Sequence, residues 1–220
     1  MEKKIKIIIA DDHTILRHGI CQAFDMEKDF TVIGQADSGR LAVSLALEHC
    51  PDIVLMDVSM PDLNGIEATK QILANNSNVK VIALSMYSDK IYVMGMLNAG
   101  ASGYLLKSCS FKELVNCIHT VLSGELCFCP EVTGHLNTNR EGLFVADNKA
   151  SVFSLLSNRE REVLQLIAEG HKTKKIAQKL GINTKTVETH RTNLKNKLNI
   201  HSIARLTKLA ITEGITSFNI

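Results

Sequence analysis

The sequence has no run of about 18 consecutive apolar residues, which excludes a helix that spans a membrane. The apolar stretch between Met1 and Asp11 is too short for the core of a signal peptide, and it has no small-residue cleavage site. We therefore expect a cytoplasmic protein without a membrane partner.

The six cysteines include no CxxC pair. In a reducing compartment, scattered thiols are usually small core residues, and we expect that here. Cys127 and Cys129 are the only close pair. A metal or redox role for them lacks a second pair of ligands nearby, and the alternation of a short strand explains their spacing as well.

Composition favours a globular chain of one or two domains. Apolar residues make up 45% of the 220 residues, which excludes a disordered chain. Residues 1–124 carry 11 Lys and Arg against 14 Asp and Glu, whereas residues 151–220 carry 12 against 5, a net charge of +7. Such a split suggests two units, of which the basic one meets a polyanion; a solvated surface explains it equally well at this stage.

The first unit alternates short apolar runs with helical patterns. The runs predict five strands, at residues 5–10, 31–34, 53–56, 79–84 and 103–106. Several runs lack polar alternation, as strands buried on both faces do. We expect an α/β fold with a doubly wound, five-stranded parallel sheet, whose site lies beyond the carboxyl ends of the strands.

Polar residues stand at those strand ends. Each alone has an ordinary explanation, such as a helix cap, a turn or a surface lysine. Together they suit phosphorylation of a carboxylate. Asp11 and Asp12 would hold Mg²⁺, and Asp57 would be both metal ligand and nucleophile. Lys107 would neutralise the phosphoryl oxygens, and the Ser85 hydroxyl would donate a hydrogen bond to one of them. The sequence lacks a glycine-rich phosphate loop, so we expect no nucleotide in this unit.

Four segments in residues 3–124 resemble the receiver domain of two-component response regulators: Ala10-Asp11-Asp12-His13, Leu55-Met56-Asp57-Val58-Ser59-Met60-Pro61 with Gly65, Ala83-Leu84-Ser85, and Gly103-Tyr104-Leu105-Leu106-Lys107. The resemblance implies a flavodoxin-like receiver phosphorylated on Asp57 by a sensor histidine kinase. It also assigns the backbone carbonyl of Ser59 to the metal, and it makes Ser85 and Tyr104 a switch pair in which the ring turns inward.

A polar, turn-rich stretch separates the two units. We take residues 1–124 as the receiver, 125–153 as the linker and 154–220 as the second domain. Residues 130–136 are expected to form a short helix in the linker.

The second domain shows four helical patterns. Ser157 and Glu160 form a capping-box sequence, and Gly170 ends the helix that follows. A shorter helix then leads to a tight turn at residues 181–183, before helices at about 184–198 and 202–213. A helix, a short turn with glycine and a second helix make up a helix-turn-helix.

The helix at 184–198 is the expected recognition helix. Val187, Leu194 and Leu198 fall on one face, and the opposite face carries only polar side chains suited to a major groove, although an ordinary solvated face also fits. The DNA-contacting candidates of this domain are Lys172, Thr173, Lys174, Lys175, Lys185, Thr186, Glu188, Thr189, Arg191, Thr192, Lys195 and Asn196.

Residues 154–215 resemble the four-helix output domain of LuxR and NarL/FixJ-type regulators, through residues 156–164 and 185–191. At Lys175 the family more often has an acidic residue. The resemblance implies that the last helix forms a dimer contact, through Ile203, Leu206, Leu209 and Ala210. The alternative is that these residues only fill the core of the monomer.

The two resemblances together imply a transcription factor of the NarL/FixJ type that is phosphorylated on Asp57, dimerises and binds double-stranded promoter DNA. RNA polymerase is a further candidate partner. We expect no enzyme activity beyond magnesium-dependent self-phosphorylation and slow self-dephosphorylation. A phosphohydrolase is the first alternative, but Ser59 stands where such enzymes commonly carry a second acid. An RNA or single-strand binder is the second, but residues 154–217 contain no aromatic side chain for stacking.

Overall fold

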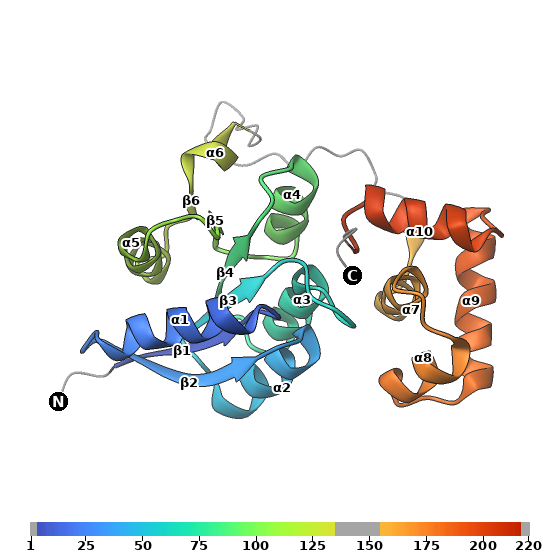
Figure 1. The fold of residues 1–220 in the computed structure, drawn as a ribbon, viewed down its shortest axis with the longest axis horizontal. Helices are drawn as coiled ribbons and strands as arrows, with labels where there is room; N and C mark the ends of the chain where they lie inside the picture. Colours follow the sequence, from blue (N-terminus) through green and yellow to red (C-terminus); the bar gives the residue numbers. More distant parts are fainter. Residues whose placement is uncertain (1–3, 135–154, 217–220) are drawn as a thin grey trace. The chain divides into compact units, whose positions relative to one another are not determined.

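The computed structural model describes residues 4–134 and 155–216. They belong to two compact units, one built from residues 4–60 and 64–134 and the other containing residues 155–216 (Figure 1). The predicted linker lies mostly outside the described residues. The described part of the linker contains a short helix, α6 (Pro130–Thr133). It begins at the predicted residue and has four residues.

The first unit contains a fully parallel sheet in the order β2-β1-β3-β4-β5-β6. The strands are β1 (Ile5–Ala10), β2 (Phe30–Ala36), β3 (Ile53–Asp57), β4 (Lys80–Ser85), β5 (Gly103–Leu106) and β6 (Cys127–Phe128). All residues of β3 and nearly all of β4 are buried, as expected for central strands covered on both faces.

The prediction of five strands was wrong by one. β6 has two residues and pairs with the edge of β5, with Gly103 opposite Cys127 and Tyr104 opposite Phe128. A strand of two residues is too short to give a periodic signal, and only its alternation around Phe128 indicated it.

The helices between the strands are α1 (Thr14–Asp25), α2 (Gly39–His49), α3 (Gly65–Asn75), α4 (Lys90–Asn98) and α5 (Phe111–Leu122). α1 and α5 lie together, because Phe24 and Phe111 meet edge to face with 5.0 Å between ring centroids. α2 contacts α3, which contacts α4. This arrangement confirms the predicted doubly wound fold.

Cys117 on α5 and Cys127 on β6 form a disulfide, with 5.6 Å between the Cα atoms. The expectation of scattered core thiols was therefore wrong for this pair, although Cys21 and Cys129 are buried free thiols. The pairing depends on β6 lying beside α5, which the sequence spacing did not reveal.

The second unit contains α7 (Asn158–Ala168), α8 (Thr173–Leu180), α9 (Thr184–Leu198) and α10 (Ile203–Thr212), which confirms the four predicted helices. Ser157 and Glu160 form both bonds of the predicted capping box. Gly181 adopts φ 63°, the left-handed conformation that lets the chain turn sharply between α8 and α9.

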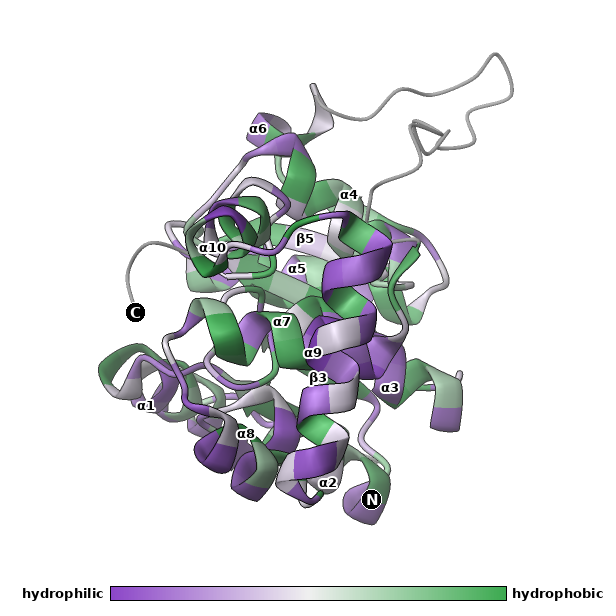
Figure 2. Ribbon diagram, turned by 90° about the vertical axis from the view of Figure 1, so that its right-hand side faces the viewer, coloured by the Kyte–Doolittle hydropathy of each residue, from purple (hydrophilic) through white to green (hydrophobic). Residues whose placement is uncertain are grey.

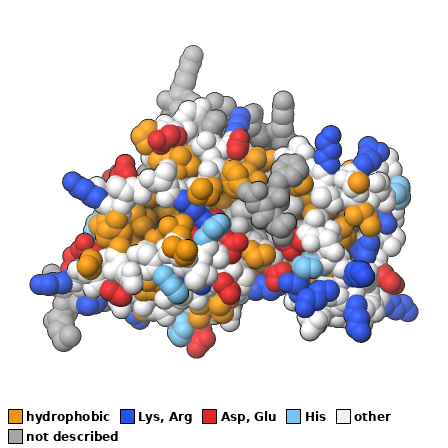
Figure 3. Space-filling model, in the orientation of Figure 1, with side chains coloured by type: hydrophobic (Ala, Val, Ile, Leu, Met, Phe, Trp, Pro, Cys, Tyr) orange, Lys and Arg blue, Asp and Glu red, His pale blue; other side chains and the backbone are white. Residues whose placement is uncertain are grey.

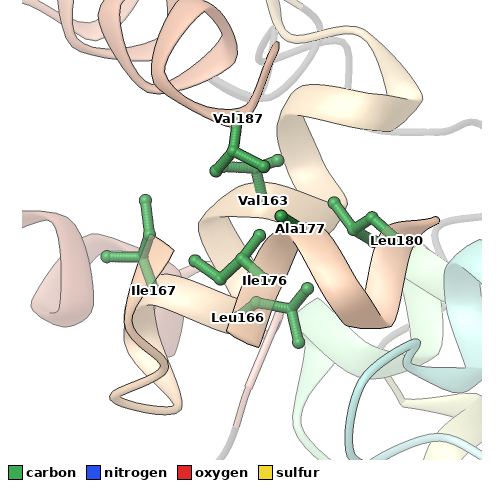
Figure 4. Close-up of a cluster of buried hydrophobic side chains, with 7 residues drawn as sticks. All are labelled: Val163, Leu166, Ile167, Ile176, Ala177, Leu180 and Val187. Carbon is green, nitrogen blue, oxygen red and sulfur yellow. The ribbon is translucent and has the colours of Figure 1, made fainter. Parts of the chain in front are cut away.

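Apolar side chains from α7, α8 and α9 hold the helix-turn-helix together (Figure 4). The cluster is Val163, Leu166, Ile167, Ile176, Ala177, Leu180 and Val187. α9 contributes only Val187 to this cluster, and its Leu194 is buried in a second cluster with residues of α7 and α10. Within the described ranges, no helix is long and apolar enough to cross a membrane.

Candidate functional site: a phosphoryl-acceptor centre and a nucleic-acid interface

Three buried charged groups meet at the carboxyl edge of the sheet. Asp11 directly follows β1, Asp57 ends β3, and Lys107 directly follows β5. Lys107 Nζ lies 2.7 Å from Asp57 Oδ2 and 2.9 Å from Asp11 Oδ2. The Lys107 side chain is 4% exposed, and those of Asp11 and Asp57 are 1% and 4% exposed. Two buried carboxylates thus share one buried ammonium group.

Backbone groups complete the surroundings of Asp57. The Ser59 N–H donates to Asp57 Oδ1 at 3.2 Å. A Cβ atom at Gly65 would lie 2.0 Å from the carbonyl oxygen of Asp57, so only glycine fits where α3 begins. This close approach gives a physical reason for the glycine of the receiver-like motif.

Burial and the neighbouring charges shift the pKa values of both Asp57 and Lys107. Burial raises the pKa of Asp57 to about 6, against the charge of Lys107, while the charge of Asp11 raises it further. Burial alone would lower the pKa of Lys107, but the charges and hydrogen bonds of Asp57 and Asp11 outweigh it and raise that pKa. Lys107 is therefore a fixed positive charge, whereas Asp57 is a carboxylate whose charge is incompletely compensated.

The donor set fits a divalent cation. Ligand atoms of Asp11, Asp12, His13 and Asp57 all lie within 4.8 Å of one another. Asp11 Oδ2 is buried, and the charged group facing it is the Lys107 ammonium at 2.9 Å. Carboxylate oxygens are the ligands that Mg²⁺ prefers, and a cation would reduce the repulsion between them.

The expected switch pair meets at a third residue. Ser85 is 1% exposed, and its Oγ accepts from the Tyr87 N–H at 3.0 Å. Tyr104 is fully buried, and its hydroxyl donates to the Tyr87 carbonyl at 2.7 Å. Burial raises the pKa of Tyr104, so this hydroxyl keeps its proton. The ring of Tyr87 stacks on Tyr92 of α4 with 5.0 Å between centroids.

The structure brings together Asp11, Asp12, Asp57 and Lys107, and it joins Ser85 to Tyr104 through Tyr87. Ser59 contacts Asp57 through its amide, whereas a role for its carbonyl stays a prediction. Sequence reasoning gave no role to His13 or Tyr87. The adjacency of His13 to Asp11 and Asp12 was the available signal for the former, and nothing in the spacing pointed to the latter.

The predicted recognition helix has the expected two faces. Val187 and Leu194 are fully buried and Leu198 packs against the core, as predicted. Most of α9 is hydrophilic or neutral (Figure 2), and Lys and Arg side chains are spread over this unit (Figure 3). The exposed candidates are Lys172, Lys174, Lys175, Lys185, Glu188, Thr189, Thr192 and Asn196.

Four candidates are half-buried: Thr173, Thr186, Arg191 and Lys195. Arg191 Nη1 donates to Thr173 Oγ1 at 2.7 Å, which ties α9 to α8. The hydroxyls of Thr189 and Thr192 donate to backbone carbonyls four residues earlier. Their methyl groups and lone pairs stay available on the surface.

The candidates on α10 fall into two sets. Leu206 and Ala210 are fully buried in the core of this unit, in agreement with the alternative that they stabilise the monomer. Ile203 is 52% exposed and Leu209 is half-buried. Of the four residues predicted to form a dimer contact, only Ile203 and Leu209 are therefore accessible on the surface of this unit.

Comparisons with known proteins agree with both units. Residues 7–119 match the response regulator receiver domain, and residues 154–210 match the bacterial regulatory proteins of the luxR family. The chain is 35% identical to the oxygen regulatory protein NreC of Staphylococcus carnosus, covering 97% of this chain and 100% of that protein. It is also 35% identical to the response regulator GacA of Pseudomonas aeruginosa, covering 96% and 97%.

Solved structures give the same result. A LuxR-family response regulator from Aurantimonas is 31% identical, with a TM-score of 0.57 over 60% of this chain and 95% of that chain. RcsB of Salmonella typhimurium, at 24% identity, has the same fold, with a TM-score of 0.56 over 94% and 98% of the two chains. With a receiver and a LuxR-type helix-turn-helix both matched, the chain belongs to the DNA-binding response regulators of two-component systems that regulate transcription.

Proposed function

We propose that Asp57 accepts a phosphoryl group from a sensor histidine kinase, and that the phosphorylated chain dimerises and binds promoter DNA. The observation that carries the proposal is the position of Lys107 Nζ between two buried carboxylates, 2.7 Å from Asp57 and 2.9 Å from Asp11. An isolated ion pair with Lys107 needs only one carboxylate, whereas a phosphoryl-acceptor centre needs several carboxylates to hold a metal ion and to accept the phosphoryl group.

The chain's own groups support each part of the transfer. An oxygen of the Asp57 carboxylate attacks phosphorus, the bond from phosphorus to the imidazole nitrogen of the kinase breaks, and an acyl phosphate forms. With a pKa of about 6, Asp57 is mostly ionised at pH 7 and so available as a nucleophile. Lys107 stabilises negative charge on the transferred oxygens. Asp11, Asp12, Asp57 and the Ser59 carbonyl would hold Mg²⁺, which when bound neutralises charge on the phosphoryl group.

The same surroundings argue against a phosphohydrolase. Ser59 lies where a second acid would protonate a leaving group, and its hydroxyl is a far weaker acid than a carboxyl group. Self-dephosphorylation is therefore slow, and the centre stores the phosphoryl group rather than turning over substrate.

An apolar surface next to the phosphoryl-acceptor centre is suited to docking of the kinase. A pocket of about 330 Å³ lies between α1 and α5, and Lys107 is one of its lining residues. Ile15, at its edge, is 90% exposed. Hydrophobic side chains gather over this part of the unit (Figure 3). We propose that the kinase domain carrying the phosphohistidine packs its apolar side chains here, which brings phosphorus to Asp57.

Phosphorylation would act on transcription by pairing two output domains on DNA. One small domain binds duplex weakly, with non-specific constants of roughly 10⁻⁴–10⁻⁶ M, and two domains held together gain by effective concentration. Ile203 and Leu209 are the surface candidates for that pairing. RcsB, a structural relative, has been solved in complex with DNA. A regulator that binds promoters acts in the cytoplasm, with RNA polymerase as its further partner. The proposed boundaries are residues 1–124 for the receiver, 125–153 for the linker and 154–220 for the output domain.

The test is phosphorylation by a small phosphodonor with Mg²⁺, read by intact mass. The wild type and Asp25→Asn, a change at an exposed carboxylate, should each gain one phosphoryl group, and Asp57→Asn should gain none. Labelling of Asp57→Asn to the wild-type level would overturn Asp57 as the acceptor. DNA binding measured on the same samples should tighten only where the label is present.

A further inference from the structure

His13 contributes a nitrogen atom to the carboxylate cluster. Its Nδ1 lies 3.0 Å from Asp12 Oδ1, 3.2 Å from Asp11 Oδ1 and 3.9 Å from Asp57 Oδ2. Lys107 Nζ lies 3.3 Å from the same nitrogen. The imidazole thus faces every carboxylate of the site, although 62% of the side chain is exposed.

Local backbone contacts hold His13 in this position. The His13 N–H donates to Asp11 Oδ1 at 2.8 Å, and the His13 carbonyl accepts from the Arg17 N–H at 3.0 Å. The Arg17 guanidinium donates to the Asp11 carbonyl. His13 is the N-cap residue of α1, but its side chain makes no capping bond. The ring is therefore free from a role in the helix and is aimed at the carboxylates by the turn that precedes it.

The ligand atoms are close enough to bind one ion. Atoms of Asp11, Asp12, His13 and Asp57 lie within 4.8 Å of one another, near the span of ligands on opposite sides of a cation bound at about 2.1 Å. Carboxylates and water suit Mg²⁺, whereas an imidazole nitrogen suits first-row transition metals such as Co²⁺ and Zn²⁺. A site with one imidazole and three carboxylates combines the two preferences.

We propose that His13 Nδ1 is a direct metal ligand, which makes this receiver select transition-metal ions over Mg²⁺ more strongly than its carboxylates alone would. The inference rests on the metal site of the proposed function and adds a specificity-determining residue to it. An imidazole that only paired with Asp12 would favour no cation over another, so the affinity ratio between cations separates the two roles.

The experiment measures the binding of Mg²⁺ and of Co²⁺ to the full chain by titration calorimetry, counting only the Co²⁺ that Mg²⁺ displaces. The variants are His13→Ala and His13→Gln. The matched control is His18→Ala, which removes an exposed histidine from the same helix. Unfolding followed by tyrosine fluorescence checks that each variant is folded.

Removal of His13 should weaken Co²⁺ binding by about tenfold or more, as loss of a ligand does, and change Mg²⁺ binding by less than about threefold. His18→Ala should match the wild type. Equal effects on both cations, or no effect on either, would overturn the role of His13 while leaving the carboxylate site intact. A wild type that binds neither cation would instead refute the metal site itself, and this inference with it.

Discussion

Replacement of Asp57 by asparagine should stabilise the metal-free receiver at neutral pH. Asp57 is 3% exposed and shares the single charge of Lys107 with Asp11. Burial raises its pKa from 3.8 to about 6, so the ionised form is less stable in the folded state than in the unfolded chain. Asparagine resembles the uncharged carboxyl group in size and removes this cost.

The magnitude follows from the two pKa values. Each pH unit between 3.8 and about 6 is worth roughly 1.4 kcal/mol, which gives a cost of about 3 kcal/mol at pH 7. Between these pH values the folded state keeps a proton that the unfolded state releases. The free energy of unfolding of the wild type should therefore fall as pH rises from about 4 to 6, and this fall should be missing in Asp57→Asn.

The assay is urea unfolding of the full chain from pH 4 to 7.5 with a chelator present, followed by tyrosine fluorescence. The chain has no tryptophan, and its three tyrosines, Tyr87, Tyr92 and Tyr104, all lie in the receiver. The signal thus reports on the receiver alone. The control is Asp25→Asn at an exposed position, which should change stability by less than about 0.5 kcal/mol.

The decisive quantity is the difference in unfolding free energy between Asp57→Asn and the wild type. It should be near zero at pH 4 and approach about 3 kcal/mol at pH 7. Added Mg²⁺ should shrink it, because bound cation stabilises the ionised wild type. A difference that stays constant over the whole pH range would refute the reasoning, since it would show that Asp57 carries no burial cost for its charge.

Three further predictions concern other parts of the chain. A thiol reductant should lower the unfolding free energy of the receiver by about 3 kcal/mol, because the Cys117–Cys127 disulfide closes a loop of 10 residues. A Cys117→Ala/Cys127→Ala variant should not respond to the reductant, and a wild type that does not respond would argue against the disulfide. Ile15→Asp should slow phosphoryl transfer from the kinase by about tenfold or more, since burial of such a side chain is worth about 1.5–3 kcal/mol, and leave labelling by a small donor unchanged. Met26→Asp, at an equally exposed methionine, is its control, and equal loss with both donors would place Ile15 in the centre instead of the docking surface. Lys174→Ala with Lys175→Ala should weaken binding to all DNA sequences alike and reduce the slope of log affinity against log salt concentration by about 2. Thr192→Ala should instead alter the sequence preference. Band-shift titrations at several salt concentrations distinguish these results.

The parts of the centre that the sequence predicted are those fixed by strand ends. Asp11, Asp57 and Lys107 each directly follow or end a buried apolar run, and parallel strands place such residues at one edge. The contacts of Tyr87 were beyond prediction, because they depend on the path of the loop after β4. β6 and the disulfide were not predicted for a related reason, because a pairing of two residues at a sheet edge leaves no periodic pattern in the sequence. On α10, periodicity identified Leu206 and Ala210 as apolar but could not tell a core from a dimer contact.

The hydrogen bonds around Tyr87 suggest how added charge at Asp57 reaches the surface of the receiver. In this structure the Ser85 hydroxyl oxygen accepts from the Tyr87 N–H, and Tyr104 holds the Tyr87 carbonyl from the other side. A phosphoryl group needs donors, and the Ser85 hydroxyl is one that it can recruit. The ring of Tyr87 stacks on Tyr92 in α4, so we expect a rearrangement of this loop to be passed to α4. Because Tyr104 is fully buried and its hydroxyl holds the Tyr87 carbonyl, we expect the loop to adopt few arrangements, as a two-state element requires. We therefore expect phosphorylation of Asp57 to be felt first at α4 and the loop before it.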